Sequence, residues 1–420
     1  MDEIDSYYKT PSELSHAVTG MRLPESQIRT ALLHEDEEIR YKAASWYSKG
    51  FSRDPSVMGT VLESVERFGP AQSWRVMREA QWLPQTAETV DALIAQLNRA
   101  GDPADLREEN FRFATGLALC RAPVELIADR ATQIDQMPSI PLVLWKPLIE
   151  RVQLRSADWD EAIAALVRLA EKTYRSRQWN RIDSLRADGV IDLLTRFTGS
   201  RGPAVLALLE RRKNQKLVEW LEPVIIRLAG MMQLTAAIPL MLDRLESAET
   251  TRSVDMGMAL VIALARMGSD AVLAPLGGRW ALSNRLGEQG AMRLRLFACN
   301  VLERLRSDQS VALLKDRIKD KVELASVRFF AAHALLAQFA LNATTVIRVL
   351  IRHAKSEGYR RRLRLYYDLL AACRVMNETF PKFETRYQKA LAANWGRANE
   401  VPRLADEYYE GPWRSERGAG

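Results

Sequence analysis

A repeat of 36–37 residues in the second half of the sequence constrains the fold more than any other feature. An apolar residue, expected to begin a helix after a short break, recurs 36, 37 and 37 residues apart at Leu240, Leu276, Leu313 and Leu350. Pro239 and Pro275 precede the first two, and proline suits the first turn of a helix because its missing N–H would have no partner there. Repeats of this length are pairs of helices, which bury their apolar faces only by stacking on the next pair.

The rest of the sequence also has a helical pattern. Apolar residues recur three and four positions apart, as in Val205, Leu208 and Leu209, and short breaks such as Gly277-Gly278 separate the runs. No alternating strand pattern joined by a two-residue turn occurs in the sequence. The length of 420 residues exceeds the roughly 250–300 that one core fills, so the chain forms either two or three domains or a repeat array that needs no single core. We therefore predict an all-α fold, an α-solenoid (superhelix) of stacked antiparallel helix pairs.

The second helix of several repeats begins with a common pattern, in which Arg follows an apolar residue and Ala stands three positions after the Arg. Three segments carry it: Ile39-Arg40 with Ala43, Leu294-Arg295 with Ala298, and Val327-Arg328 with Ala331. The pattern resembles that of HEAT repeats, closely over about residues 217–355, well at 28–50 and more diffusely from 60 to 210. The resemblance implies a HEAT- or ARM-like superhelix of the kind found in helical-repeat proteins of bacteria.

Three arginines in this pattern, Arg40, Arg295 and Arg328, are expected to be structural. Each follows an apolar core position at the start of a second helix. The planar guanidinium of such a residue can donate to carbonyl or carboxylate groups of the adjacent repeat.

The sequence divides into five segments. We assign an N-terminal cap or irregular segment to 1–25, divergent HEAT-like hairpins to 26–210, regular HEAT repeats to 211–357, C-terminal capping helices to 358–394, and a partly disordered tail to 395–420. No low-complexity tract or flexible linker pattern separates these segments, which favours a continuous array.

Residues with catalytic or metal-binding spacing are absent from the sequence. None of the four histidines stands at ligand spacing from a cysteine or a second histidine. Glycine-rich phosphate loops and a nucleophile elbow are also missing. Acidic residues such as Asp105 and Asp158 precede expected helices, which predicts capping. We therefore expect a non-enzymatic protein without catalytic residues, cofactor or metal.

Cysteine usage and hydropathy predict a cytoplasmic protein. Cys120, Cys299 and Cys373 follow small apolar residues and are expected to be buried, unreactive thiols, since their odd and sparse set fits no disulfide framework. No stretch reaches the roughly 18 apolar residues of a membrane helix. The acidic start lacks an apolar segment, so we expect no secretory signal.

Charge is unevenly distributed along the chain. Residues 1–150 carry 16 basic and 23 acidic side chains, whereas residues 151–400 carry 41 and 26. Two clusters in the basic part are candidate contacts to nucleic acid or another anionic partner: Lys172, Arg175, Arg177, Trp179 and Arg181, and then Arg360, Arg361 and Arg364. The alternatives are a solvated loop between repeats for the first cluster and the exposed face of a terminal helix for the second.

The leading functional hypothesis is a scaffold that binds a protein partner on a concave surface, which superhelices of this kind commonly present. The alternative is a nucleic-acid-binding protein with a basic groove, similar in architecture to HEAT-like alkylpurine DNA glycosylases, although none of their catalytic residues matches a position here. A bilin lyase or chaperone rests on fold analogy alone. A groove of mixed sign favours protein, and a continuous positive groove favours nucleic acid.

Overall fold

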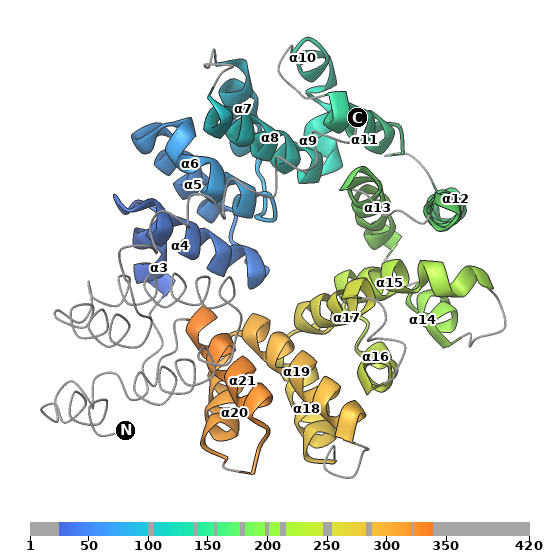
Figure 1. Cartoon of the computed structure of the whole chain (residues 1–420). Helices are drawn as coiled ribbons and strands as arrows, with labels where there is room; N and C mark the ends of the chain where they lie inside the picture. Colours follow the sequence, from blue (N-terminus) through green and yellow to red (C-terminus); the bar gives the residue numbers. More distant parts are fainter. Residues whose placement is uncertain are drawn as a thin grey trace, which may run out of the picture. The chain divides into compact units, whose positions relative to one another are not determined.

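The computed structural model describes residues 25–99, 105–137, 142–154, 158–176, 181–197, 201–210, 216–246, 254–282, 288–320 and 322–338. All regular elements in these residues are α- or 3₁₀-helices, which confirms the predicted all-α class (Figure 1). None of the described helices is long and apolar enough to cross a membrane. Contacts divide the chain into a unit of residues 25–313 and a second unit, whose described part is residues 314–320 and 322–338.

A continuous row of helices runs through the unit of residues 25–313, and each helix of the row packs against the next. The row consists of α4 (Glu37–Lys49), α6 (Pro70–Ala80), α8 (Leu106–Arg121), α11 (Leu142–Gln153), α13 (Arg181–Leu194), α15 (Lys216–Met231), α17 (Val254–Met267) and α19 (Glu288–Leu305). Two of the three second helices named in the sequence pattern belong to this row, because Arg40 lies in α4 and Arg295 in α19, whereas Arg328 lies in a later helix.

The other helices of this unit flank the row. They are α3 (Glu25–Ala31), α5 (Ser56–Phe68), α7 (Ala87–Asn98), α9 (Val124–Ala128), α10 (Ala131–Asp135), α12 (Trp159–Ser176), α14 (Gly202–Glu210), α16 (Ile238–Glu246) and α18 (Ser269–Leu282), with 3₁₀ turns η2 (Thr195–Phe197) and η3 (Thr235–Ala237). α5 packs on α6 and α7, α12 on α13 and α15, and α16 on α17, α18 and α19. Two further helices follow, α20 (Asp308–Lys319) and α21 (Ala325–Ala337).

Several helices of the row end at a residue with positive φ, which reverses the chain. These residues are Phe51 (φ 52°), Gln233 (φ 54°), Gly268 (φ 92°) and Arg306 (φ 54°). After α15, the N–H of Leu234 donates back to the carbonyl of Ala229 at 3.0 Å, the hydrogen bond that closes such an end. Left-handed backbone costs a residue other than glycine about 1–2 kcal/mol, so packing around these ends must stabilise them.

Small residues bring α15 and α17 into close contact. Gly230 of α15 is buried, and a Cβ atom at this position would lie 2.4 Å from the Cα atom of Ala263 in α17. Both helices bury apolar residues beside this point, including Ile226 and Leu260. Absence of a side chain at Gly230 therefore sets the distance between these two helices.

The structure corrects two expected helix boundaries. α16 begins at Ile238, so Pro239 lies in a first turn as predicted. α18, however, begins directly after Gly268 and continues to Leu282, which places Pro275, Leu276 and Gly277-Gly278 inside a helix. The helix continues because a buried stripe four residues apart anchors it, formed by Val272, Leu276 and Trp280. Leu313 likewise lies inside α20, and Leu350 lies outside the described residues.

The first and last helices of the row are in contact. The Lys49 ammonium lies 3.9 Å from the Glu303 carboxylate, and the Arg304 guanidinium donates to the carbonyl of Lys49 at 3.5 Å. Arg306 stacks on the ring of Trp46 at 4.4 Å. We call this set of interactions the terminal contact; it joins residues about 255 positions apart in the sequence.

Replacing Gly230 with Ala should lower the free energy of unfolding by about 1–3 kcal/mol, because the new methyl group would collide with the backbone of α17. Gly59→Ala is the matched control: Gly59 is exposed in α5, and no atom lies within 4 Å of the position that the added methyl group would take, so stability should rise by about 0.5–1 kcal/mol. Urea denaturation measures both changes. Equal effects of the two substitutions would contradict the close packing of α15 on α17.

Candidate functional site

The first predicted basic cluster lies partly in helices. α12 extends to Ser176 and α13 begins at Arg181, so Lys172 and Arg175 belong to a helix rather than to a loop. Lys172 is exposed. α12 continues this far because its buried residues recur every four positions, at Ala162, Leu166 and Ala170. The other candidate contacts lie outside the described residues: Arg177, Trp179, Arg360, Arg361 and Arg364.

Arg40 is fully buried, and its guanidinium contacts backbone carbonyls and an aromatic ring. Its guanidinium donates to the carbonyls of His34 and Glu35 at 2.7 and 2.8 Å, and to that of Gln72 in α6 at 2.9 Å. The same group stacks on Phe68 at 4.0 Å. Burial lowers the pKa of Arg40. These contacts tie α4 to the loop before it and to the next helix of the row.

The other two arginines of the repeat pattern differ in their surroundings. Arg295 is buried in α19. Arg328 lies in α21, where its Nε donates to the carbonyl of Ile318 at 3.0 Å, at the end of the preceding helix. That all three arginines contribute to stability remains a prediction.

Buried thiols and capping carboxylates occupy the positions predicted from the sequence pattern. Cys120 and Cys299 are buried and free, and Cys373 lies outside the described residues. Burial raises the pKa of Cys120 to about 12, so the thiol is protonated at neutral pH. Asp105 and Asp158 accept backbone N–H groups at the starts of α8 and α12, both at 2.8 Å. No group of three potential metal-ligating residues occurs in the described part of the chain.

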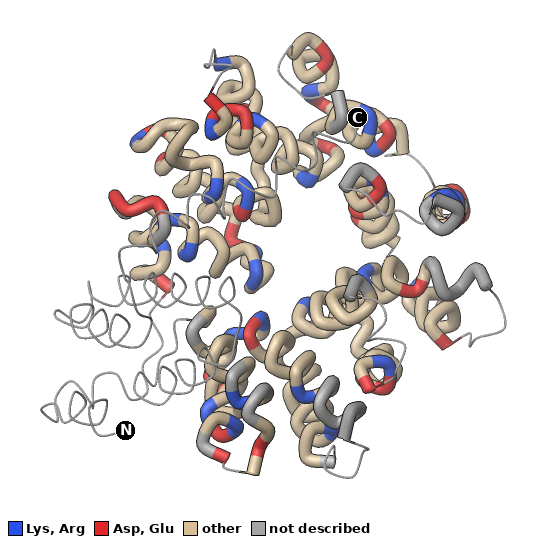
Figure 2. The backbone as a smooth tube through the Cα atoms, in the orientation of Figure 1, with Lys and Arg blue, Asp and Glu red and all other residues tan. Residues whose placement is uncertain are grey.

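Arginines recur at the C-terminal ends of the helices of the row. Six of them lie within five residues of a helix end: Arg78 in α6, Arg121 in α8, Arg151 in α11, Arg227 in α15, Arg266 in α17 and Arg304 in α19. A helix C-terminus carries partial negative charge, which favours a cation there. Figure 2 marks both basic and acidic positions on the described helices.

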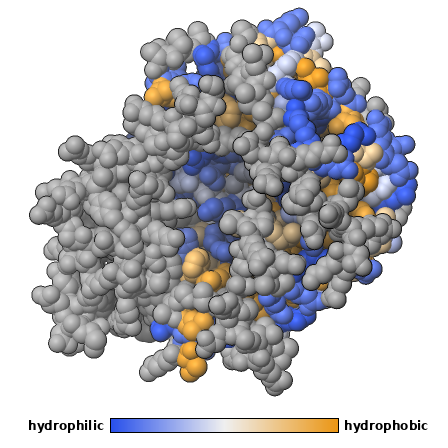
Figure 3. All heavy atoms as spheres, turned by 45° about the vertical axis from the view of Figure 1, so that its right-hand side comes forward, coloured by the Kyte–Doolittle hydropathy of each residue, from blue (hydrophilic) through white to orange (hydrophobic). Residues whose placement is uncertain are grey.

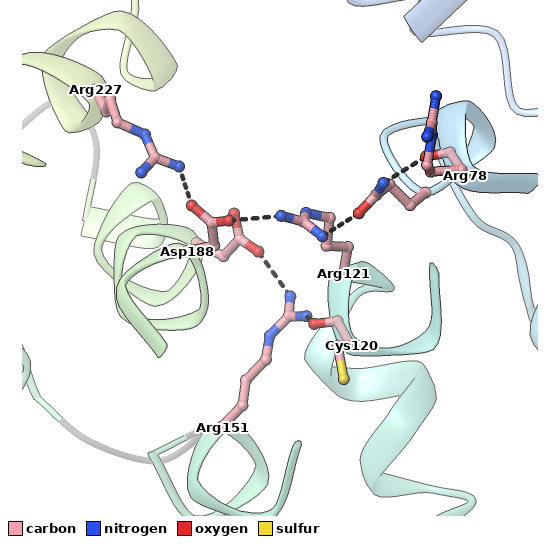
Figure 4. A network of polar contacts seen from close by, with 8 residues as sticks. Arg78, Cys120, Arg121, Arg151, Asp188 and Arg227 are labelled. Carbon is pink, nitrogen blue, oxygen red and sulfur yellow. Dashed lines mark hydrogen bonds and ion pairs between the residues drawn. The ribbon is translucent and has the colours of Figure 1, made fainter. Parts of the chain in front are cut away.

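Asp188 of α13 links two of these arginines (Figure 4). Arg121 donates to one carboxylate oxygen at 3.2 Å, and Arg227 donates to the other oxygen. The side chains of Asp188 and Arg121 are each only 12% exposed. One carboxylate thus joins α8, α13 and α15, and burial lowers the pKa of Arg121 despite the attraction of Asp188.

The polar network extends from Arg121 to α6. Arg121 donates to the side-chain oxygen of Gln81, and the amide of Gln81 donates to the carbonyl of Arg78 (Figure 4). The Arg121 guanidinium also stacks on the ring of Trp82 at 3.7 Å, and Trp82 is 42% exposed. A continuous chain of contacts therefore runs from α6 to α15.

Arg151 forms a second link between helices of the row. It donates to the carbonyl of Cys120 in α8 and, at 2.7 Å, to the carboxylate of Asp192 in α13 (Figure 4). Gly189 leaves room for its stem, because a Cβ atom there would lie 3.1 Å from Arg151 Cγ. The side chain of Asp192 is 34% exposed. Desolvation by the surrounding protein raises the pKa of Asp192, and the positive charge of Arg151 opposes this rise.

Arg266 and Arg304 lie beside the same aromatic ring. Their guanidinium carbons are 4.8 and 5.9 Å from the centre of the Phe51 ring. Burial lowers the pKa of both arginines. Asp192 opposes this effect at Arg266, and Glu303 and Glu79 oppose it at Arg304. We call the set Arg121, Arg151, Arg227, Arg266, Arg304, Asp188 and Asp192 the arginine–aspartate cluster.

Sequence reasoning did not identify this cluster. A signal was present, because Arg227, Arg266 and Arg304 are 39 and 38 residues apart, close to the repeat period. Repetition of a basic residue at the same place in successive helices indicates that their side chains lie next to each other. The two acidic partners in α13 follow no repeat, so only the structure shows them.

Asp188→Asn should lower the free energy of unfolding by about 3–5 kcal/mol, because two buried guanidinium groups would lose their counter-charge. Asp91→Asn is the matched control. Asp91 pairs with Arg130 but its side chain is 56% exposed, and loss of such a pair changes stability by less than about 1 kcal/mol. Guanidinium denaturation compares the two variants, and a small effect at Asp188 would show that the link between α8 and α15 is dispensable.

Arg40→Ala should lower the free energy of unfolding by about 3 kcal/mol, since the fully buried side chain and its three hydrogen bonds to backbone carbonyls would be lost. Arg328→Ala removes one hydrogen bond and should lower it by about 1 kcal/mol. Thermal melting measures both. Unchanged melting of Arg328→Ala together with loss of partner binding would instead assign Arg328 to a binding surface.

Comparisons with known proteins leave the family of the chain open. No family model and no curated protein matches the sequence. Among solved structures, the crystal structure of an engineered protein is similar over 89% of this chain and 100% of its own, at 12% identity and a TM-score of 0.23. A TM-score this low carries no structural argument, so the HEAT resemblance rests on the sequence pattern.

Proposed function

We propose that the chain is a cytoplasmic, non-enzymatic scaffold of HEAT-like helix pairs, arranged as an α-solenoid, that binds a protein partner on its concave surface. Stacking of each row helix on the next supports this arrangement, because repeat proteins are built from such nearest-neighbour contacts. In this proposal the continuous row lines the binding surface and the flanking helices support it from behind.

The mixed sign of the arginine–aspartate cluster is the observation that carries the proposal. Asp188 and Asp192 lie between arginines from α8, α11 and α15, and Asp192 is partly exposed. Carboxylates at these positions would repel the phosphates of a nucleic acid, whose affinity depends on uninterrupted basic contacts. A protein surface, which presents both signs of charge, complements such a cluster better.

Exposed aromatic and apolar side chains add a second argument. Trp82 presents 42% of its surface beside Arg121, and tryptophan paired with arginine is typical of the residues that dominate protein interfaces. Among the described residues seen in Figure 3, hydrophilic residues lie side by side with apolar ones. Such a surface suits a partner that recognises a few anchors within polar surroundings.

Co-purification followed by reconstitution tests the proposal. We expect a protein to co-purify in fixed stoichiometry with the full chain and to re-form the complex when both are purified separately. Trp82→Ala should weaken the reconstituted complex in calorimetry, whereas Leu106→Ala, which removes another exposed apolar side chain, should not. A chain that forms no reproducible stoichiometric complex contradicts the scaffold.

Duplex DNA titrated at two salt concentrations tests the nucleic-acid alternative. Four phosphate contacts from the segment 172–181 would give a log–log salt slope near roughly −3 to −4. We expect weak binding without such a slope, and little effect of reversing the charges of Arg175 and Arg177. Tight binding that is lost on charge reversal would replace the scaffold with a nucleic-acid-binding protein.

A further inference from the structure

The arginine–aspartate cluster carries more positive than negative groups. Five guanidinium groups and two carboxylates make up the cluster, and Glu303 and Glu79 lie near enough to Arg304 to attract it. Asp188 forms ion pairs with Arg121 and Arg227, and Asp192 forms one with Arg151. Neither carboxylate forms an ion pair with the remaining two arginines.

Arg266 and Arg304 are the arginines left over. Within the described residues, their guanidinium groups form no ion pair with a carboxylate, and Arg304 has only a long hydrogen bond of 3.5 Å to the carbonyl of Lys49. Both stack near Phe51, whose φ of 52° places it at the turn that ends α4. Three separate elements, α17, α19 and this turn, thus bring two cations together around one ring.

We propose that Arg266 and Arg304, stacked near Phe51 and flanked by Arg227, form a binding site for the carboxylate groups of an acidic segment in the partner protein. The proposal rests on the proposed function and adds the chemistry of the partner. Incoming carboxylates would complete the alternation of guanidinium and carboxylate that Asp188 and Asp192 begin.

The neighbouring pairs show why carboxylates suit this site. Asp188 uses both of its oxygens to bind two arginines from different helices, and Asp192 binds Arg151 at 2.7 Å. The planar guanidinium matches a carboxylate with two parallel donors. The carboxylates of Asp188 and Asp192 also reduce the positive potential at the site. This lowers the affinity for a polyphosphate more than the affinity for an acidic peptide, whose single charges are spaced along its backbone.

Like charges gather at this site. Arg227 and Arg304 both lower the pKa of Arg266, and Asp192 opposes them. Glu303 and Glu79 attract Arg304, but neither forms an ion pair with it among the described residues. An incoming carboxylate would therefore meet two guanidinium groups that have no ion-pair partner among the described residues.

Fluorescence anisotropy with a labelled octaglutamate peptide tests the site in the full chain. We expect saturable binding at low salt that weakens as salt is added. Arg266→Gln and Arg304→Gln together should weaken it by about tenfold or more, which corresponds to the loss of at least one charge-assisted hydrogen bond. Saturating peptide should raise the melting temperature of the wild type, and it should raise that of the double variant less.

Arg279→Gln provides the matched control. Arg279 lies in the flanking helix α18 and pairs with Asp243 and Glu246, so its replacement removes the same charge outside the cluster. Peptide affinity should change less than about twofold, because the long-range effect of one exposed charge is small at moderate salt. Equal losses in the control and the double variant would show that net charge alone attracts the peptide and would overturn the site.

Two further outcomes would overturn the assignment. Inorganic tripolyphosphate that binds far more tightly than the peptide would make this a phosphate site. A lower melting temperature of the double variant with unchanged peptide affinity would make both arginines structural.

If a reconstituted partner complex forms equally well with the double variant, the site is wrong but the scaffold stands. If the peptide binds as expected and no partner complex exists, the scaffold fails and the site stands.

Discussion

Dependence of each row helix on its neighbour is the constraint that governs this structure. A single helix pair has apolar residues that it cannot bury alone, so burial is completed by the next pair. Close approach of α15 and α17 at Gly230 and Ala263 shows how small residues make this possible. Left-handed residues at the ends of the row helices then return the chain for the next pair. The stacking of the helices therefore depends on particular residues at their contacts and ends, and those residues are stabilised in turn by the stacking.

Arginine takes part in this structure in three different ways. Arg40 is fully buried and donates to three backbone carbonyls. Arg121 binds Asp188 and Arg151 binds Asp192, so two carboxylates of α13 connect helices that are not consecutive in sequence. Arg266 and Arg304 are half-buried beside an aromatic ring, and among the described residues neither forms an ion pair with a carboxylate. The proposed acidic segment of a partner would supply the ion pairs of this third case.

Sequence patterns predicted the helical class because stacking imposes a regular spacing on apolar residues. They located the turn at Gly268 and the helix start at Pro239, where local backbone preferences agree with the fold. They failed at Pro275 and Gly277-Gly278, because burial of Val272 and its neighbours holds α18 together against the local preference. The cluster was harder to predict, since Arg121 and Asp188 are 67 positions apart and meet only through the stacking of α8, α13 and α15. Periodic arginines were visible in the sequence, and their aperiodic partners were not.

The terminal contact changes how a chain of repeats loses its structure. A linear array frays from its ends, because the outermost pair has a neighbour on one side only. Here α4 has α6 on one side and meets the end of α19 through Lys49 on the other. Closing a loop this long costs little more entropy than closing a short one, because the cost grows only with the logarithm of loop length. Local opening at α4 must therefore also break contacts made by the far end of the unit, which makes unfolding more cooperative and protects the amide hydrogens of the first helices from exchange.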